Sequence, residues 1–217
     1  MLTEYQAVLA KVAVFTDVTS ARRSADLRCS AGCSGCCHAW LAVSAVEAAS
    51  LRTGLAALPA AHREVVRERG RQERAREAAG EAPARCALLD DDDRCAVYET
   101  RPLVCRTQGH ALRYPEGFIP ASSIRRKTPN GEETWCPLNY DAAAPEPRDV
   151  LDAERVDQLL AVVGARYERA RAGVDATVAT GQRRFALSEL AAAAADEDIP
   201  HDAQFPRARA GQDTERQ

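Results

Sequence analysis

The stretch that decides this fold is CSAGCSGCCH, residues 29–38, which places four of the chain's eight cysteines within nine consecutive positions. The other four are spread more thinly over residues 86–136. Thiolates bind soft and borderline metals, and several must converge, because zinc takes four ligands and an iron–sulfur cluster usually takes four cysteines. Structural disulfides are rare in a reducing cytosol, so metal binding or thiol chemistry is the leading explanation for these cysteines.

Length and composition indicate one domain outside the membrane. A chain of 217 residues is long enough for one hydrophobic core. No apolar run approaches the roughly 20 residues of a membrane span, and the first residues lack the basic region and cleavage site of a secretory signal. The net charge is -3, without the basic excess of nucleic-acid-binding domains. We therefore expect a cytoplasmic protein with no membrane or nucleic-acid partner, and no protein partner is indicated.

Two predicted helices flank the cysteine-rich stretch. Apolar residues recur at helical spacing at the start of the chain, where Thr3 and Gln6 have the form of a capping box. After the stretch, Ser44 and Glu47 repeat that box and open a second helix, which is expected to end near Pro59. The first cysteines therefore lie in a loop between two helices.

A charged helix is predicted over residues 60–79. Glutamate and arginine recur there at i,i+3 spacing, in the pairs Glu64–Arg67, Glu68–Arg71 and Glu73–Arg76. Because the two signs alternate, we interpret this face as solvated rather than as nucleic-acid-binding. Gly70 is expected to weaken the helix.

The next cysteines are predicted on short elements. CALLDDDDRCAVY, residues 86–98, has two apolar arms joined across four aspartates, which predicts a short β-hairpin that brings its two cysteines together. The aspartates lack the spaced ligands of a calcium loop and are interpreted as a polar turn. Thr100 and Pro102 favour a helix start and Gly109 a helix stop, which places Cys105 on a short helix.

The C-terminal half is predicted to be less regular. Turn residues are frequent over residues 111–150, which predicts irregular or extended chain around Cys136 and a tight turn at Asn130-Gly131. An apolar stripe then predicts a C-terminal helix over residues 152–172. Residues 191–217 have few apolar anchors and are expected to form a disordered tail.

The predicted fold class is therefore mainly α. We expect a small helical domain over residues 1–190, with irregular cysteine-bearing loops and a short β-hairpin around the metal site. The cysteine motif itself occupies residues 25–140.

The adjacent cysteines Cys36 and Cys37 bear on the number of metal sites. Neighbouring side chains in extended chain point to opposite sides, so the two are not expected to share one ion. The spacing suggests one nucleus that uses members of Cys29, Cys33 and Cys36. Cys37 and the distant cysteines would form a second nucleus or extend the first, and the assignment stays open. Zinc ribbons generally show two C-x2-C pairs, whereas only one such pair occurs here, which favours iron–sulfur over zinc.

The spacing Cys29-x3-Cys33-x2-Cys36 also matches the radical S-adenosylmethionine cluster motif. Those enzymes look like partial α/β barrels, in which the cluster loop follows a strand and an aromatic residue usually precedes the third cysteine. Here a helix is predicted before the loop and Gly35 holds that position. The resemblance is therefore limited to spacing.

The whole array resembles the YkgJ-type cysteine-cluster family, which is described as a zinc- or iron-chelating domain. The resemblance runs from about residue 25 to 140, and residues 150–190 also look like the C-terminal helix of one subgroup. It is carried by the CxxxCxxCC array, by Arg94-Cys95, by the YExRPxxCR segment from Tyr98 to Arg106, and by Cys136.

The resemblance implies a metal site with eight ligands, whose cofactor is an iron–sulfur cluster or zinc. The implied ligands are Cys29, Cys33, Cys36, Cys37, Cys86, Cys95, Cys105 and Cys136. Flagellin lysine methylases look similar in their cysteine array, which implies that some relatives carry out chemistry at an iron–sulfur centre. Whether this chain is an enzyme, and which residues would be catalytic, stays open.

Three functions are compatible with these residues. The leading hypothesis is a cytosolic metal-binding protein with a redox or electron-transfer role. One alternative is an iron–sulfur-dependent group-transfer enzyme, which would need an open coordination position. The other is a thiol-based metal carrier with exposed, low-pKa thiolates.

Charged residues and histidines near the cysteines have two interpretations. Arg101 or Arg106 would donate hydrogen bonds to thiolate or sulfide. Alternatively, Glu99 and Arg101 form an ion pair that joins the hairpin to the helix, and both interpretations stay open. His38 and His110 are interpreted as hydrogen-bonding residues rather than as ligands, because eight cysteines are available.

Overall fold

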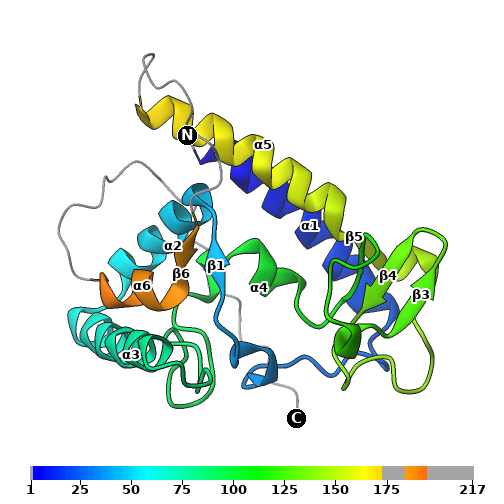
Figure 1. The fold of residues 1–217 in the computed structure, drawn as a ribbon, viewed down its shortest axis with the longest axis horizontal. Coiled ribbons are helices and arrows are strands. Elements are labelled where there is room, and N and C mark those ends of the chain that lie inside the picture. The colour runs from blue at the N-terminus through cyan, green and yellow to red at the C-terminus, as the bar shows by residue number, and fades with distance from the viewer. Residues whose placement is uncertain (1, 173–183, 195–217) are drawn as a thin grey trace, which may run out of the picture.

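The computed structural model describes residues 2–172 and 184–194, and its regular structure is mainly helical, as the sequence predicts (Figure 1). The α-helices are α1 (Thr3–Arg22), α2 (Ala45–Ala57), α3 (Ala60–Ala78), α4 (Leu103–Thr107), α5 (Ala153–Ala172) and α6 (Leu187–Ala192). The strands are β1 (Ala42–Val43), β2 (Ala111–Tyr114), β3 (Arg126–Thr128), β4 (Gly131–Thr134), β5 (Val150–Asp152) and β6 (Phe185–Ala186). Short 3-10 turns are η1 (Gly35–Cys37), η2 (Tyr98–Thr100), η3 (Ala121–Ser123) and η4 (Pro147–Asp149).

Two small sheets accompany the helices. The larger has the strand order β3-β4-β2-β5, in which only β2 and β5 are parallel, and β1 pairs with β6 in the smaller. The larger sheet lies within residues 111–152, and Cys136 follows β4 in chain without regular structure, as the sequence predicts. Its strands are only three or four residues long, so they are too short to show a clear alternation of apolar and polar residues. The turn between β3 and β4 lies where Asn130-Gly131 predicts it.

The helices form two groups that the cysteine-bearing loop connects. In Figure 1, α1 and α5 lie side by side, with the larger sheet at one end of the pair, and α2, α3 and α6 form the second group. The chain after α1 runs from the sheet past α4 to η1, and β1 then leads into α2. The residues from 29 to 37 therefore cross between the two halves of the domain.

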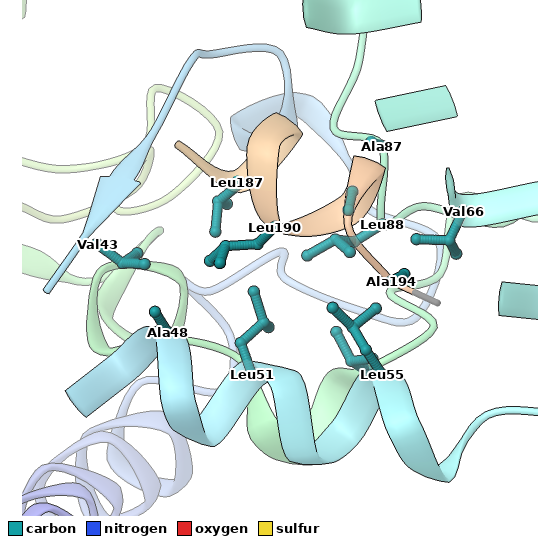
Figure 2. Packing of buried hydrophobic residues seen from close by; sticks show 12 residues of the cluster. Val43, Ala48, Leu51, Leu55, Val66, Ala87, Leu88, Leu187, Leu190 and Ala194 are labelled. Carbon is teal, nitrogen blue, oxygen red and sulfur yellow. The ribbon is translucent and has the colours of Figure 1, made fainter. Parts of the chain in front are cut away.

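The largest hydrophobic cluster lies among α2, α3 and α6 (Figure 2). Leu51 and Leu55 of α2 face Leu190 of α6, and all three side chains are buried. The chain just after Cys86 contributes Ala87 and Leu88 to the same cluster. This core thus extends from the helices to the loop that carries the later cysteines.

Glycine explains how closely α3 packs on α6. A Cβ atom at Gly70 would lie 2.4 Å from the backbone nitrogen of Ala192 and 2.9 Å from the Cβ of Ala191. The sequence predicts that Gly70 weakens α3, but its lack of a side chain is what allows this close contact. The predicted i,i+3 ion pairs are all present on α3, with nitrogen–oxygen distances of 2.6, 2.7 and 3.9 Å.

The helix ends show which capping predictions hold. Ser44 and Glu47 form the predicted box at the start of α2, and the Ser44 N–H donates to Glu47 Oε2 at 2.9 Å. The predicted box at Thr3 is wrong, because α1 begins one residue earlier than that box requires and Leu2 is its N-cap. Helix α5 covers the range of the predicted apolar stripe.

Two further expectations concern the membrane and the tail. Within the described residues, none of the helices combines the length and apolarity that a membrane crossing requires. Residues 191–194 of the expected tail complete and follow α6, and residues 195–217 lie outside the part of the chain that the structure describes.

Candidate metal centre

The eight cysteines come from five separate segments, and all are free thiols. Cys29 and Cys33 lie in the loop after α1, and η1 carries the adjacent pair at positions 36 and 37. Two more lie in the loop between α3 and η2, one on α4 and one just after β4, at Cys86, Cys95, Cys105 and Cys136. The site therefore depends on tertiary contacts rather than on a single local motif.

A cavity of about 400 Å³ brings six of these cysteines together. Its wall also includes apolar side chains such as Leu88 and Leu187, and the polar side chains of Tyr98 and Arg101. The six cysteines that line it are Cys33, Cys36, Cys37, Cys86, Cys95 and Cys105. Thiols that lie up to about 70 positions apart in sequence thus line one open cavity.

The two arms of the predicted hairpin around Cys86 and Cys95 are joined by backbone hydrogen bonds of 2.8 Å, from the Ala96 N–H to the Leu88 carbonyl oxygen and from the Asp90 N–H to that of Arg94. Leu89 and Cys95 form an isolated antiparallel bridge, and no strand is assigned within this described segment. The Cys86 N–H also donates to the carbonyl oxygen of Cys37 at 2.7 Å. Backbone hydrogen bonds therefore join the two cysteine-bearing loops directly.

The four aspartates of this loop form a polar turn, as the sequence predicts. Asp91 pairs with Arg69 of α3, and Asp93 pairs with Arg85 at 2.9 Å. Arginine thus neutralises two of the carboxylates. The Arg69–Asp91 pair thus holds the loop against α3.

Four cysteines form an inner group: Cys37, Cys86, Cys95 and Cys105. Burial, with a smaller contribution from the neighbouring thiols, raises the pKa of the Cys86 thiol to about 11 and that of Cys105 to about 12. Burial also raises the pKa of Cys95, although hydrogen bonding and Arg101 partly offset this effect. The thiols of all three face Cys37 closely enough to raise its pKa. Without metal, the thiols of Cys86, Cys95 and Cys105, whose pKa values are raised, stay protonated at neutral pH.

The remaining four cysteines form an outer group: Cys29, Cys33, Cys36 and Cys136. Desolvation raises the pKa of Cys29, a hydrogen bond from Asn139 lowers it, and the thiols of the other three members raise it again. The residues Cys29, Cys33 and Cys36 are exposed, whereas the members of the inner group are all partly buried. The two groups thus differ in their access to solvent.

The two groups meet at Cys36 and Cys37, whose thiols share a hydrogen bond. The Cys36 thiol donates to the Cys37 sulfur, which raises the pKa of Cys36 and lowers that of Cys37. The expectation that these side chains diverge is wrong, because it assumes extended chain, whereas both residues lie in the 3-10 turn η1. Cys36 also lies near Cys105 of the inner group.

Asn139 fixes the outer group, and sequence reasoning missed it. Its buried side chain accepts from the Arg28 N–H at 2.8 Å, donates to the Gly109 carbonyl oxygen at 2.8 Å, and lies 3.4 Å from the Cys29 sulfur. Gly109 is also constrained, because its φ is +91° and an added Cβ would lie 2.6 Å from that sulfur. The position of Asn139, three residues after Cys136, was the available signal.

The charged neighbours of the cysteines divide into two roles. Arg106 holds the backbone, since its Nε donates to the Arg101 carbonyl oxygen at 2.9 Å and its terminal nitrogen donates to that of Glu99. Arg101 lines the cavity instead. Neither His38 nor His110 lines the cavity; burial lowers the pKa of His110, and the Nδ1 of His38 contacts the Ala84 carbonyl oxygen.

The donor set fits a soft or borderline metal. Sulfur atoms dominate the cavity, as zinc and iron–sulfur sites require. Over residues 2–172 and 184–194, however, no three histidine, cysteine, aspartate or glutamate side chains are arranged so that they could hold one metal ion. The thiols surround a space rather than converge on a point.

The comparisons with known proteins agree with this chemistry. Residues 28–137 match the model of the CxxCxxCC family, which is described as a "Putative zinc- or iron-chelating domain". No curated protein and no solved structure matches this chain.

Proposed function

Because this chain belongs to the CxxCxxCC family of zinc- or iron-chelating domains, we propose that its eight cysteines hold metal in two adjoining four-cysteine groups. The observation that carries the proposal is the cavity itself, where six cysteines from four segments face one another. The other two, Cys29 and Cys136, lie beside Cys33 and Cys36. Each group then supplies the four thiolates of a zinc site or of one iron–sulfur cluster.

An iron–sulfur centre is the form that the cavity supports best. The sulfurs that share one zinc ion lie about 2.3 Å from it and must converge closely. The thiolates of a cluster bind different iron atoms, with sulfide between them, so they lie farther apart. The arrangement around a space of about 400 Å³ suits the second case. A bound iron–sulfur centre supplies electron-transfer chemistry, which is the proposed role in a reducing cytosol.

The difference in burial between the inner and outer groups supports a difference in how firmly each group holds its metal. The inner group lies partly buried against the hydrophobic core, so its metal is shielded from competing ligands. Exposed residues of the outer group let thiols and chelators approach. This exposure favours a second candidate function, in which the outer group delivers metal to another protein.

Metal content decides between these forms. The chain is purified without oxygen, and iron, zinc and acid-labile sulfide are measured per chain, together with the visible spectrum. Iron with matching sulfide supports the iron–sulfur form, and zinc in a colourless protein supports the zinc form. Less than one equivalent of either metal per chain, from cells supplied with both, would reject the proposed function.

Variants locate the metal. Cys95→Ser removes an inner ligand and is expected to abolish the metal of that group, whereas Cys33→Ser removes only outer metal. Ser30→Ala is the matched control, because its side chain is exposed in the same loop. Equal losses from the two cysteine variants would indicate one shared centre instead of two groups.

A further inference from the structure

Arg101 lines the cysteine cavity, and no carboxylate among the described residues forms an ion pair with it. It is half-buried, it lines the cavity, and its buried Nε has no hydrogen-bond partner among the described residues. The contact that the structure shows is with the ring of Tyr98, whose centroid lies 3.6 Å from the guanidinium carbon. A half-buried cation without an anion is costly, so its position calls for an explanation.

Nearby carboxylates do not neutralise Arg101. Asp91 and Asp93 are taken by arginines of α3 and of the preceding loop. The predicted ion pair with Glu99 is absent from the described residues, where this glutamate instead accepts a hydrogen bond from Arg106 through its carbonyl oxygen. Arg106, and not Arg101, therefore holds this part of the chain together, and it does so through hydrogen bonds to the backbone.

The surrounding chain aims Arg101 at the cavity. Arg106 binds the carbonyl oxygens of both Glu99 and Arg101, which fixes the backbone on either side of the turn. Stacking on Tyr98 uses the face of the guanidinium and leaves the N–H groups at its edge free to donate. The side chain is thus positioned before any ligand arrives.

A metal–thiolate centre supplies the missing negative charge. Four thiolates leave a net charge of about minus two, whether they bind an iron–sulfur core that carries a charge of plus two or a single zinc ion. Partial burial makes that charge expensive unless a cation compensates it. The two positively charged residues that line the cavity are Arg101 and Arg94, and Arg94 is exposed. Hydrogen bonds from outside the ligand set tune such centres and their metal affinity.

We propose that Arg101 is the positioning residue of this centre, whose guanidinium donates hydrogen bonds to the metal-bound thiolates and balances their charge. This inference rests on the proposed function, because it requires metal in the cavity. It goes further by assigning a role to a residue that is not a ligand.

Three variants and zinc test the proposal. Arg101→Met removes the charge at similar length, Arg101→Lys keeps the charge without the planar fork, and Arg94→Met is the matched control at the same cavity. Each protein is stripped of metal and titrated with zinc in competition with a colorimetric chelator. Thermal unfolding of the metal-free forms is measured in parallel.

Arg101→Met is expected to lower zinc affinity by roughly 10- to 100-fold, as for other residues that support metal ligands. Arg101→Lys should recover part of that loss, Arg94→Met should stay within about 2-fold of wild type, and the metal-free forms should unfold at the wild-type temperature. Unchanged zinc affinity in Arg101→Met would overturn the inference while leaving the proposed function intact. A lower unfolding temperature of metal-free Arg101→Met that accounts for its loss of zinc affinity would also overturn the inference. A wild-type chain that binds neither zinc nor iron would reject both proposals.

Discussion

The side-chain nitrogen of Asn139 lies 3.4 Å from the sulfur of Cys29, across 110 positions of sequence. The same amide group satisfies the backbone of Arg28 and of Gly109. One buried side chain thus joins three loops at the outer cysteine group. The geometry of that group therefore depends on a residue that has no place in the cysteine motif.

Asn139→Ala should destabilise the chain by roughly 1–3 kcal/mol, because it leaves the partly buried Arg28 N–H and the buried Gly109 carbonyl oxygen without their partner. The loss is measured as the free energy of unfolding in urea, with Asn130→Ala, at an exposed turn, as the control. Outer metal should be lost more easily in the Asn139 variant. Equal free energies of unfolding for the two variants would show that the hydrogen bonds of Asn139 do not stabilise the fold.

Gly109→Ala should damage the outer group in particular. Its positive φ strains any side chain, by about 1–3 kcal/mol, and the new Cβ would displace the Cys29 sulfur. Gly117→Ala is a matched control, since Gly117 has a φ of +74° but open space around it. Metal stoichiometry should fall in the first variant and not in the second. If both variants bind the same amount of metal per chain, the close approach of Gly109 to the Cys29 sulfur does not matter for metal binding.

Alkylation should separate the two cysteine groups in the metal-loaded protein. Cys33 is exposed and should react with iodoacetamide well before Cys105, whose sulfur is partly buried against the hydrophobic core. Peptide mass spectrometry after short exposures gives the order of reaction. Simultaneous modification of the two would contradict the distinction between outer and inner groups.

Acid should weaken the junction between α1 and η4 through Asp149. Burial by itself raises the pKa of this carboxyl, but hydrogen bonds from Arg23, the Glu146 N–H and Arg22 outweigh it, and the net pKa is lowered. A lowered folded-state pKa stabilises the fold above the unfolded value of about 4, and this contribution is lost as pH falls through the folded-state pKa.

Asp149→Asn tests this contribution. It should cost about 3 kcal/mol at neutral pH, because the carboxylate is fully buried and Arg22 and Arg23 lose their partner. The difference from wild type should shrink in urea melts at successively lower pH. Asp141→Asn, at an exposed carboxylate, is the control. A difference that is independent of pH would contradict the assignment.

Local patterns in the sequence predicted local structure well. The Ser44–Glu47 box, the charged face of α3 and the end of α4 before Gly109 all follow from contacts between residues near in sequence. The cysteine spacing likewise indicated metal binding. Each of these signals is complete within one helix or one motif, so no knowledge of the fold is needed to read it.

Features that depend on distant contacts could not be predicted in this way. The contacts of Asn139 arise only when loops from opposite ends of the motif meet. The sequence offered Arg101 or Arg106 as donors to the thiolates, and only the structure shows that Arg101, and not Arg106, lines the cavity. The sequence argument that Cys36 and Cys37 point to opposite sides assumed extended chain, whereas both residues lie in the 3-10 turn η1. From the sequence, Gly70 was expected only to weaken α3, whereas the structure shows that it allows α6 to pack closely on that helix.

The contact between the inner cysteines and the hydrophobic cluster has a consequence for the lifetime of the protein in a cell. Cys86, Cys95 and Cys105 pack directly against the cluster that α2, α3 and α6 share. A chain that lacks metal loses a cross-link at the edge of its largest apolar core, so local opening there exposes the segments that proteases and chaperones recognise. Metal supply would then set the abundance of this protein through its turnover, even if synthesis stayed constant.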